Sequence, residues 1–415
     1  MKITFNLSDF FQALETVAVV TPKPVSASGG AGYLFISSGT TCSLYSRDDL
    51  CVSSASFPIL EGSEPGRFVY PAEYLGALKY LGNDDTCTIE AVEEDGKYKV
   101  RYTSSSGSES EHSSFDPELL STCDEDLEAS SVTHEFLAKL LREALSQSRP
   151  FLGKADDSKI TENFKGAQVM DATRVDKDKN IDYSKGDGYL FVGDSFRTYH
   201  FQCESFKGKS LEIHGQHLGM LLTFLGKCGP KVSIRKGAHF TFAVNESGHV
   251  LGWPRHAKLH DKFNYYPLAT DKIILKVNKT RFLNSLNHAR SELTKGEDKI
   301  KFHYDPELRQ VWFTTFSGTS RAKSIPVSVE IKGEEGVLGF AIGVNIDHLI
   351  ELVSSVKGHD IEFRGAIFPP NATRKIEVGL FRTIDTFYLD PSGKVTPEPE
   401  GAEKCTVTRF MPSKN

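Results

Sequence analysis

The strongest constraint on this fold is a helix-then-strand pattern that occurs three times along the chain. The copies cover residues 74–90, 217–235 and 348–364. The apolar residues of the last two copies align without a gap, with His217 falling on His348 and Leu225 on Val356. Repeats of this kind stack on one another, so we expect the function to reside in the assembly of units rather than in one pocket.

Each unit is also predicted to begin with a strand and a helix. The first helix follows residues 1–7 and is capped by Ser8, the second follows residues 130–132 and begins at Thr133, and the third follows residues 273–277 and begins at Asn278. The repeated segments add a helix with one apolar stripe, a polar turn and an alternating strand. The predicted order in every unit is therefore strand, helix, several strands, helix, several strands.

The length of 415 residues indicates several domains, because one hydrophobic core seldom organises more than about 250 to 300 residues. The repeats predict three domains at residues 1–128, 129–270 and 271–415. Residues 121–131 are acidic and polar and are interpreted as the first linker, and residues 266–270 as the second. The polar stretch 154–188 predicts an extended, mobile loop, and 391–401 a shorter insertion.

The composition is that of an ordinary soluble globular protein, with 39% hydrophobic and 25% charged residues. No apolar run is long enough for a membrane span. The start of the chain alternates like a strand and lacks the apolar block of a signal peptide, so we expect a cytoplasmic protein. Seven cysteines without a Cys-x-x-Cys pair are interpreted as free, mostly buried thiols.

The sequence lacks the patterns that nucleotide hydrolysis, acyl transfer or metal chemistry would need. Before Gly208-Lys209-Ser210 a phosphate-binding loop requires a leading glycine, and Cys203 stands there instead. No Gly-x-Ser-x-Gly motif is present. His256 and His260 have the spacing of a helical metal pair, but Trp253-Pro254 precedes them and we interpret them as loop histidines. We therefore expect no enzymatic activity, no cofactor and no metal.

Positive charge is concentrated on two of the predicted helices, although the chain has a net charge of −6. The candidate phosphate-contacting residues are these helical cations and one loop lysine: Lys139, Arg142, Arg149, Lys279, Arg281, Arg290, Lys295 and Lys23. A charge run is usually only a solvated helix face. If equivalent helices face one side of a curved assembly, however, their cations form one surface for sequence-independent, salt-sensitive phosphate contacts.

Five short segments, in their order and spacing, resemble the bacterial-type replicative sliding clamp, the beta clamp. They are Ser46-Arg47-Asp48-Asp49-Leu50, Gly66-Arg67-Phe68-Val69-Tyr70-Pro71-Ala72, Gly193-Asp194-Ser195-Phe196-Arg197, Phe263-Asn264-Tyr265-Tyr266-Pro267 and Phe410-Met411-Pro412. The resemblance extends over nearly the whole chain. It implies an α+β fold of three tandem clamp-type domains, each with two helices packed on antiparallel sheets, forming half of a six-domain ring.

The resemblance also implies a function without catalysis. Two chains, a homodimer, would close head to tail, encircle duplex DNA and tether a DNA polymerase as a processivity factor, after loading by a separate ATP-driven clamp loader. A cleft between the second and third domains would bind a partner peptide through its apolar anchors. Its residues would be Asp194, Phe196, Arg197, Thr198, Tyr265, Tyr266, Arg409, Phe410 and Met411. Phe410 and Met411 are equally well interpreted as core residues of the last strand.

Several positions differ from the family pattern. Residues 27–32 replace a proline-rich stretch, Phe196 and Thr198 stand where the family tends to have His and Leu, and Pro267 stands where it tends to have Arg. These differences suggest a divergent or viral (phage) clamp, acting in the host cytoplasm, with partners of its own. Two alternatives remain: a clamp-fold structural or adaptor protein that does not thread DNA, and an enzyme with an unrecognised site at a domain junction.

Overall fold

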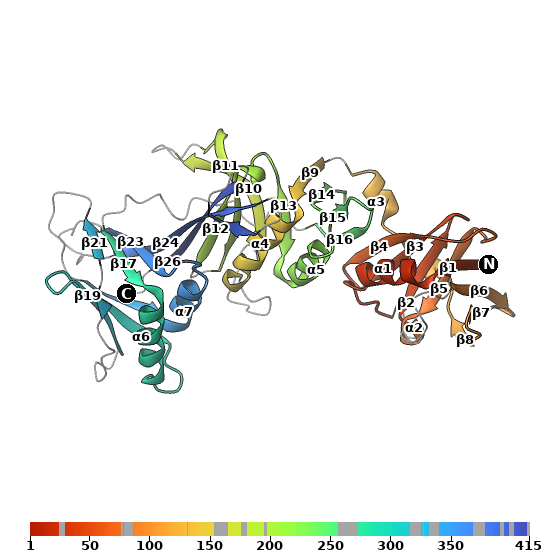
Figure 1. Cartoon of the computed structure of the whole chain (residues 1–415), viewed down its shortest axis with the longest axis horizontal. Helices are drawn as coiled ribbons and strands as arrows, with labels where there is room; N and C mark the ends of the chain where they lie inside the picture. The colour runs from red at the N-terminus through yellow and green to blue at the C-terminus, as the bar shows by residue number, and fades with distance from the viewer. Residues whose placement is uncertain are drawn as a thin grey trace. The chain divides into compact units, whose positions relative to one another are not determined.

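The computed structural model describes most of the chain. The described residues are 1–24, 30–75, 78, 86–130, 132–152, 165–175, 181–194, 197–255, 273–315, 325–326, 328–331, 340–367, 378–390, 394–397 and 402–412. The chain divides into two compact units, Met1–Arg142 with Gln216–Ala257 and Glu143–Gly215 with Lys258–Asn415. Each unit is described by itself (Figure 1).

The first unit contains two antiparallel sheets and the helices that pack on them. Its N-terminal part comprises β1 (Lys2–Asn6), α1 (Leu7–Val17), β2 (Gly32–Ser37), β3 (Thr41–Arg47), β4 (Val52–Pro58), β5 (Gly66–Pro71), α2 (Ala72–Leu75), β6 (Thr86–Glu94), β7 (Lys97–Ser104) and β8 (Glu109–Ser114). It continues with η2 (Pro117–Leu119), α3 (Asp124–Glu128) and β9 (Val132–Leu137), and later β14 (Lys231–Lys236), β15 (Phe240–Asn245) and β16 (Val250–Pro254). Helices α4 (Ala138–Ser148) and α5 (Gly215–Leu225) contain the boundaries between the units.

The sheets of the first unit have four and eight strands, in the orders β1-β6-β7-β8 and β5-β2-β3-β4-β16-β15-β14-β9. Both sheets pack against α1, which buries Phe10, Leu14 and Val17 on one face. The Phe10 ring packs 5.1 Å from that of Phe5, centroid to centroid, in a core without solvent contact. Aromatic packing of this density explains why the strands around α1 keep a single register.

The second unit is built in the same way around α6 and α7. Its elements are η3 (Arg149–Phe151), β10 (Gly166–Val175), β11 (Ile181–Gly193), β12 (Thr198–Gln202), η5 (Glu204–Phe206), β13 (Leu211–His214), β17 (Ile273–Asn278), α6 (Lys279–Ser291), β18 (Lys299–Asp305), β19 (Gln310–Thr315), β20 (Ile325–Pro326), β21 (Ser328–Ile331), β22 (Phe340–Asn345), α7 (Ile346–Ser354), β23 (Asp360–Ile367), β24 (Val378–Leu389), β25 (Val395–Thr396) and β26 (Glu403–Pro412). The larger sheet runs β13-β10-β11-β12-β26-β24-β23-β17-β21, with β25 on β24, and the smaller runs β20-β19-β18-β22.

The three predicted copies of each repeated segment are present. Strand and helix follow one another in β1–α1, β9–α4 and β17–α6, and helix and strand in α2–β6, α5–β14 and α7–β23. Helix α6 is capped by Asn278, whose side chain accepts a hydrogen bond from the Arg281 amide at 3.1 Å. The division into exactly three domains stays a prediction, since two sheets cross its boundaries.

Two predicted helix starts were wrong. Helix α1 begins at Leu7, one residue before the predicted cap Ser8. Helix α4 begins at Ala138 rather than Thr133, because residues 132–137 form β9 and pair with β14. Phe136 and Leu137 imitate a helical stripe because they stand four residues before Leu140 and Leu141. Only the pairing partner, which is distant in sequence, distinguishes the strand from a helix.

Much of the predicted mobile loop 154–188 is a hairpin, so this prediction was also wrong. Strands β10 and β11 pair antiparallel, and Ala167 and Val169 are buried. Backbone pairing supplies the hydrogen bonds here, which the polar composition concealed. The predicted linker 121–131 likewise contains the short helix α3, and β25 forms inside the predicted insertion 391–401. The predicted second linker, 266–270, lies outside the described residues.

The cysteines are all free, and six of the seven are buried, as predicted. Burial raises the pKa of the Cys42 and Cys87 thiols to about 12. None of the helices in the described part of the chain is long and apolar enough to cross a membrane.

Candidate functional site

Two strand pairs join segments of different predicted domains, and we call them the first and second joints. At the first joint β4 pairs with β16, with Val52 opposite Gly252. At the second joint β12 pairs with β26, with Thr198 opposite Phe410. Each joint lies inside one compact unit. The second joint contains the described part of the predicted peptide cleft.

The second joint is organised around the tight turn that contains Asp194 and Arg197. The Asp194 amide donates to the Arg197 carbonyl at 2.9 Å, and the Asp194 carboxylate accepts the Arg197 amide at 2.6 Å. The guanidinium returns to the same carboxylate, with Nη2 2.9 Å from Oδ2. It also bonds Glu351 of α7 and the Pro150 carbonyl. Because Arg197 is only 5% exposed, these partners compensate a cation that water does not reach.

Arg409 is the second buried cation of this joint. Its Nη2 donates to the Ser355 carbonyl just beyond α7 at 2.8 Å, and its guanidinium lies over the Tyr199 ring. The side chain has no exposed surface. The predicted wall at Thr198 and the predicted floor at Arg409 and Phe410 are therefore brought together. Asp194, Arg197, Thr198 and Arg409 are nevertheless buried, so they offer little surface to a peptide.

The predicted cleft has five further residues. Phe196, Tyr265 and Tyr266 lie outside the described residues, as do His256 and His260. Phe410 and Met411 belong to β26, but only their backbone is described. Lys357, just beyond the end of α7, bonds Glu143 of α4 and lies over the Phe387 ring of β24. These contacts connect the end of α7 to α4 and to β24.

The predicted DNA-contacting cations are placed on helices and at their ends. Arg281 is an exposed residue of α6, and Lys295 is an exposed residue of the turn that follows this helix. Four of the eight cations are exposed and have no side-chain partner among the described residues: Lys139, Arg149, Arg281 and Lys295. These four combine charge with access to solvent, as a phosphate contact requires.

The other four predicted cations are engaged within the protein. Lys23 pairs with Asp49 at 2.8 Å and Arg290 with Asp347 at 2.9 Å, both at the surface. Arg142 donates to the Leu222 carbonyl at 3.2 Å, and Lys279 to the Ser354 carbonyl at 3.1 Å. Surface ion pairs of this kind contribute little and exchange readily. Lys23 and Arg290 could still release their partners to a phosphate.

The first joint was missed as a functional feature by sequence reasoning. Its turn at Asp48 repeats the turn at Asp194: the Asp48 amide donates to the Cys51 carbonyl at 3.0 Å, and the Asp48 carboxylate accepts the Cys51 amide at 2.6 Å. Cys51 and His217 share a buried hydrogen bond of 3.1 Å. Asp48 and Asp194 each follow a strand, in the first and second predicted domains. This repeated aspartate is the sequence signal that identifies the two equivalent turns.

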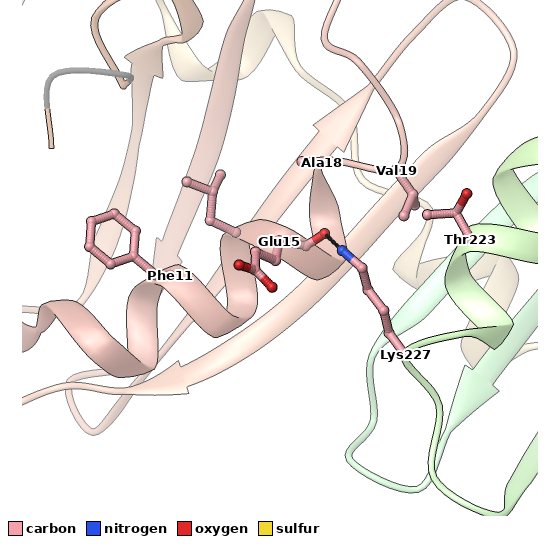
Figure 2. Close-up of a pocket in the computed structure, with 7 residues that line it drawn as sticks. Phe11, Glu15, Ala18, Val19, Thr223 and Lys227 are labelled. Atoms are coloured by element: carbon pink, nitrogen blue, oxygen red, sulfur yellow. Dashed lines mark hydrogen bonds between the residues drawn. The ribbon is translucent and has the colours of Figure 1, made fainter. Parts of the chain in front are cut away.

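A groove of about 510 Å³ lies beside the first joint, between α1 and the end of α5 (Figure 2). We call it the joint groove; its lining is Phe11, Leu14, Glu15, Ala18, Val19, Thr223 and Lys227. Lys227 reaches across it and donates to the Glu15 carbonyl (Figure 2). In the described part of the chain, histidine, cysteine and acidic side chains form no group of three or more that could hold a metal ion.

Comparison with known proteins identifies the fold. No protein-family model and no curated protein sequence matches the chain. Solved structures match over 100% of both chains: the DNA polymerase III subunit beta of Pseudomonas aeruginosa at TM-score 0.71 and 15% identity, a putative DNA polymerase III beta subunit of Eubacterium rectale at 0.71 and 12%, and the DNA polymerase sliding clamp of Caulobacter crescentus at 0.70 and 14%. The chain has the α+β fold of these sliding clamps, and the resemblance is confirmed at the level of fold.

Proposed function

We propose that this chain is a DNA sliding clamp: two copies form a closed ring around duplex DNA and tether a replicative polymerase. The strand pairing at the two joints is the observation that carries this proposal. The same kind of pairing occurs at both joints, so it can also be applied to a contact between two copies of the chain. The clamp fold shared with solved structures makes the same arrangement physically reasonable, although identities of 12–15% establish fold alone.

The pairing rule is the same at both joints. Each proposed domain supplies a strand before its second helix and a last strand at its end. At the first joint β4 of one domain pairs with the last strand, β16, of the next, and at the second joint β12 pairs with the last strand, β26. The strands left over are β20, equivalent to β4 and β12, and β8, equivalent to β16 and β26.

These two remaining strands are complementary edges. Among the described residues β8 pairs only with β7, and β20 only with β19. In the ring, β20 of each copy would pair with β8 of the other copy. This gives two identical head-to-tail contacts. Closure would cover edges that otherwise favour aggregation. Two chains of three domains would then make a ring of six.

The contact with DNA would be loose and electrostatic. Lys139, Arg149, Arg281 and Lys295 would meet phosphates directly, and the other four candidate cations would contribute after exchanging their partners. The grip would come from encirclement, so the net charge of −6 is no obstacle. The protein would not be an enzyme, and a separate ATP-driven loader would open the ring.

The polymerase and the loader would bind at the second joint. The buried Arg197 and Arg409 hold β12, β26 and α7 in a fixed relation. Such a framework suits a cleft whose remaining, apolar residues receive the anchors of a short peptide. The proposed residues of this cleft are those predicted from the sequence, with the buried Asp194, Arg197, Thr198 and Arg409 as positioning residues.

Retention on DNA of different topology tests the proposal. The chain is dissociated by dilution, reconcentrated with circular duplex DNA and separated from free protein by gel filtration. We expect a species of twice the 46.0 kDa chain mass that stays with circular DNA and is released when a restriction enzyme linearises it. Equal, rapid loss from both forms would contradict encirclement and favour an adaptor that does not thread DNA.

A further inference from the structure

The first joint has less strand pairing than the second. Only Val52, Ser53 and Ser54 of β4 pair with β16, whereas all five residues of β12 pair with β26. The joint groove separates α1 from the end of α5, and among the described residues that line it only Lys227 donates a hydrogen bond across it (Figure 2). Few backbone bonds and an open groove are features of a segment that opens at low free energy.

Residues 123–130, which we call the strap, brace this joint from the side of the sheets. The strap contains α3 and connects the proposed first and second domains. The Tyr45 hydroxyl of β3 donates to the Asp124 carboxylate at 2.9 Å. Leu127 packs against a small buried cluster that contains Val52 of β4 and Val250 of β16. The strap therefore contacts both strands of the first joint.

Asp126 attaches the strap to the turn between β14 and β15. Its carboxylate accepts three successive backbone amides, from Ala238 at 2.6 Å, His239 at 3.2 Å and Phe240 at 2.9 Å. Successive amides that converge in this way form a binding site for an anion, here filled by the protein itself. Hydrogen bonds to a charged acceptor are stronger than bonds between neutral groups.

The turn is shaped for this carboxylate. A side chain at Gly237 would place its Cβ 2.4 Å from the Asp126 Oδ2, so only glycine leaves room for it. Arg255 holds the turn from the other side by donating to the Gly237 carbonyl at 3.0 Å. The Asp126 carboxylate, Gly237 and the three amides thus form one specific binding arrangement rather than a chance surface contact.

We propose that the strap is a latch that holds the first joint closed, and that Asp126 is its catch. When the Asp126 carboxylate leaves the turn, the strap detaches from β4 and β16, the short strand pairing opens and the joint groove widens. The joint is then the place at which the chain bends. This inference concerns the joint alone and does not depend on whether the protein encircles DNA.

Hydrogen exchange of the full chain, measured by mass spectrometry, tests the latch. Asp126→Asn keeps the shape of the side chain and removes its charge, and Gly237→Ala evicts the carboxylate while the strap sequence stays intact. We expect each to accelerate amide exchange in β4, β16 and residues 223–227 by roughly tenfold, the size of a lost hydrogen bond to a charged group. Glu125→Gln, an exposed acid of the same helix, is the matched control and should change nothing.

The double variant distinguishes a latch from general destabilisation. Because both substitutions break the same contact, Asp126→Asn with Gly237→Ala should exchange no faster than either alone. Exchange in α6 and β18 should stay at the level of the unmodified protein. Unchanged exchange at the first joint in both single variants would overturn the proposal. So would acceleration that spreads equally to α6 and β18, since the strap would then support the fold rather than the joint.

Discussion

At the scale of residues, the second joint depends on buried cations whose partners come from distant segments. Arg197 bonds Asp194, which is 7% exposed in its side chain, and Glu351, which is 50% exposed. The two contacts therefore differ in strength, because water screens the second and not the first. A buried charge that loses its partners costs far more than a surface one.

Arg197→Ala should lower the free energy of unfolding by about 3 to 5 kcal/mol, because it removes the guanidinium that is ion-paired with the buried Asp194 carboxylate. Glu351→Gln is the control, and should cost less than about 1 kcal/mol since its carboxylate is half exposed. Urea denaturation followed by tryptophan fluorescence and circular dichroism measures both. Similar losses in the two variants would show that Arg197 is not the centre of the network.

The buried thiols predict a loss of stability in alkali. Burial raises the pKa of Cys42, Cys51 and Cys87 to about 12 in the folded chain, above the 9.0 of a free thiol. The folded state thus favours the protonated form. Its contribution to stability is complete below pH 9 and is lost as the pH rises from about 9 towards 12.

Thiol labelling checks the burial of the thiols on which this prediction rests. With a thiol-reactive disulfide, the native chain should react first at the partly exposed Cys228, and the other six cysteines should react only after denaturant is added. Raising the pH from 7 to 9 should leave those six unreactive. Rapid labelling of all seven at pH 8 would show that the cores open more easily than the packing indicates.

At the scale of elements, three helices follow an asparagine, but only two of these asparagines form a side-chain cap. Asn278 caps α6 and Asn345 caps α7, each through a hydrogen bond from the amide three residues later, to Arg281 and His348. Asn6 precedes α1 in the same way but makes no side-chain cap. Identical residues at equivalent positions of the repeat therefore contribute differently.

Asn278→Ala and Asn345→Ala should each lower stability by about 1 kcal/mol, the usual contribution of an N-cap. Asn6→Ala is the matched control and should cost distinctly less, because no cap is lost. Thermal unfolding of the three variants, compared with the unmodified chain, measures the difference. An equal cost at all three positions would mean that packing, rather than capping, sets these helix starts.

Strands β9, β10 and β11 show where local sequence failed at this scale. The sequence predicts residues 166–175 as part of the polar loop 154–188, and it places Phe136 and Leu137 in a helix. Both belong to sheets because β11 and β14 offer backbone partners. The strand propensity of a polar segment is weak by itself, and tertiary pairing overrides it.

At the scale of the whole molecule, the proposed ring predicts where salt dependence should arise. Replacing Lys139, Arg149, Arg281 and Lys295 by Ala should weaken binding to linear duplex DNA and reduce the slope of log affinity against log salt by about 3 to 4. Fluorescence anisotropy with a labelled duplex measures the slope.

A charge-matched control separates contact from net charge. Four exposed lysines outside the helices, Lys97, Lys207, Lys394 and Lys404, are replaced by Ala in a second variant. The net charge changes equally in both, so a similar loss would show that overall charge governs binding. A loss confined to the first variant would support contacts by the helix faces.

The sequence alone determined the repeat, the order of its strands and helices and the buried thiols, because these depend on periodicity and on neighbours within a few residues. Arg409 was predicted at the cleft, but its burial over Tyr199 became visible only in the tertiary structure. The same is true of the β9–β14 pairing and of Asp126 in its turn. These features rest on hydrogen bonds and desolvation between segments far apart in the chain, and neither leaves a pattern in the residues on one side alone.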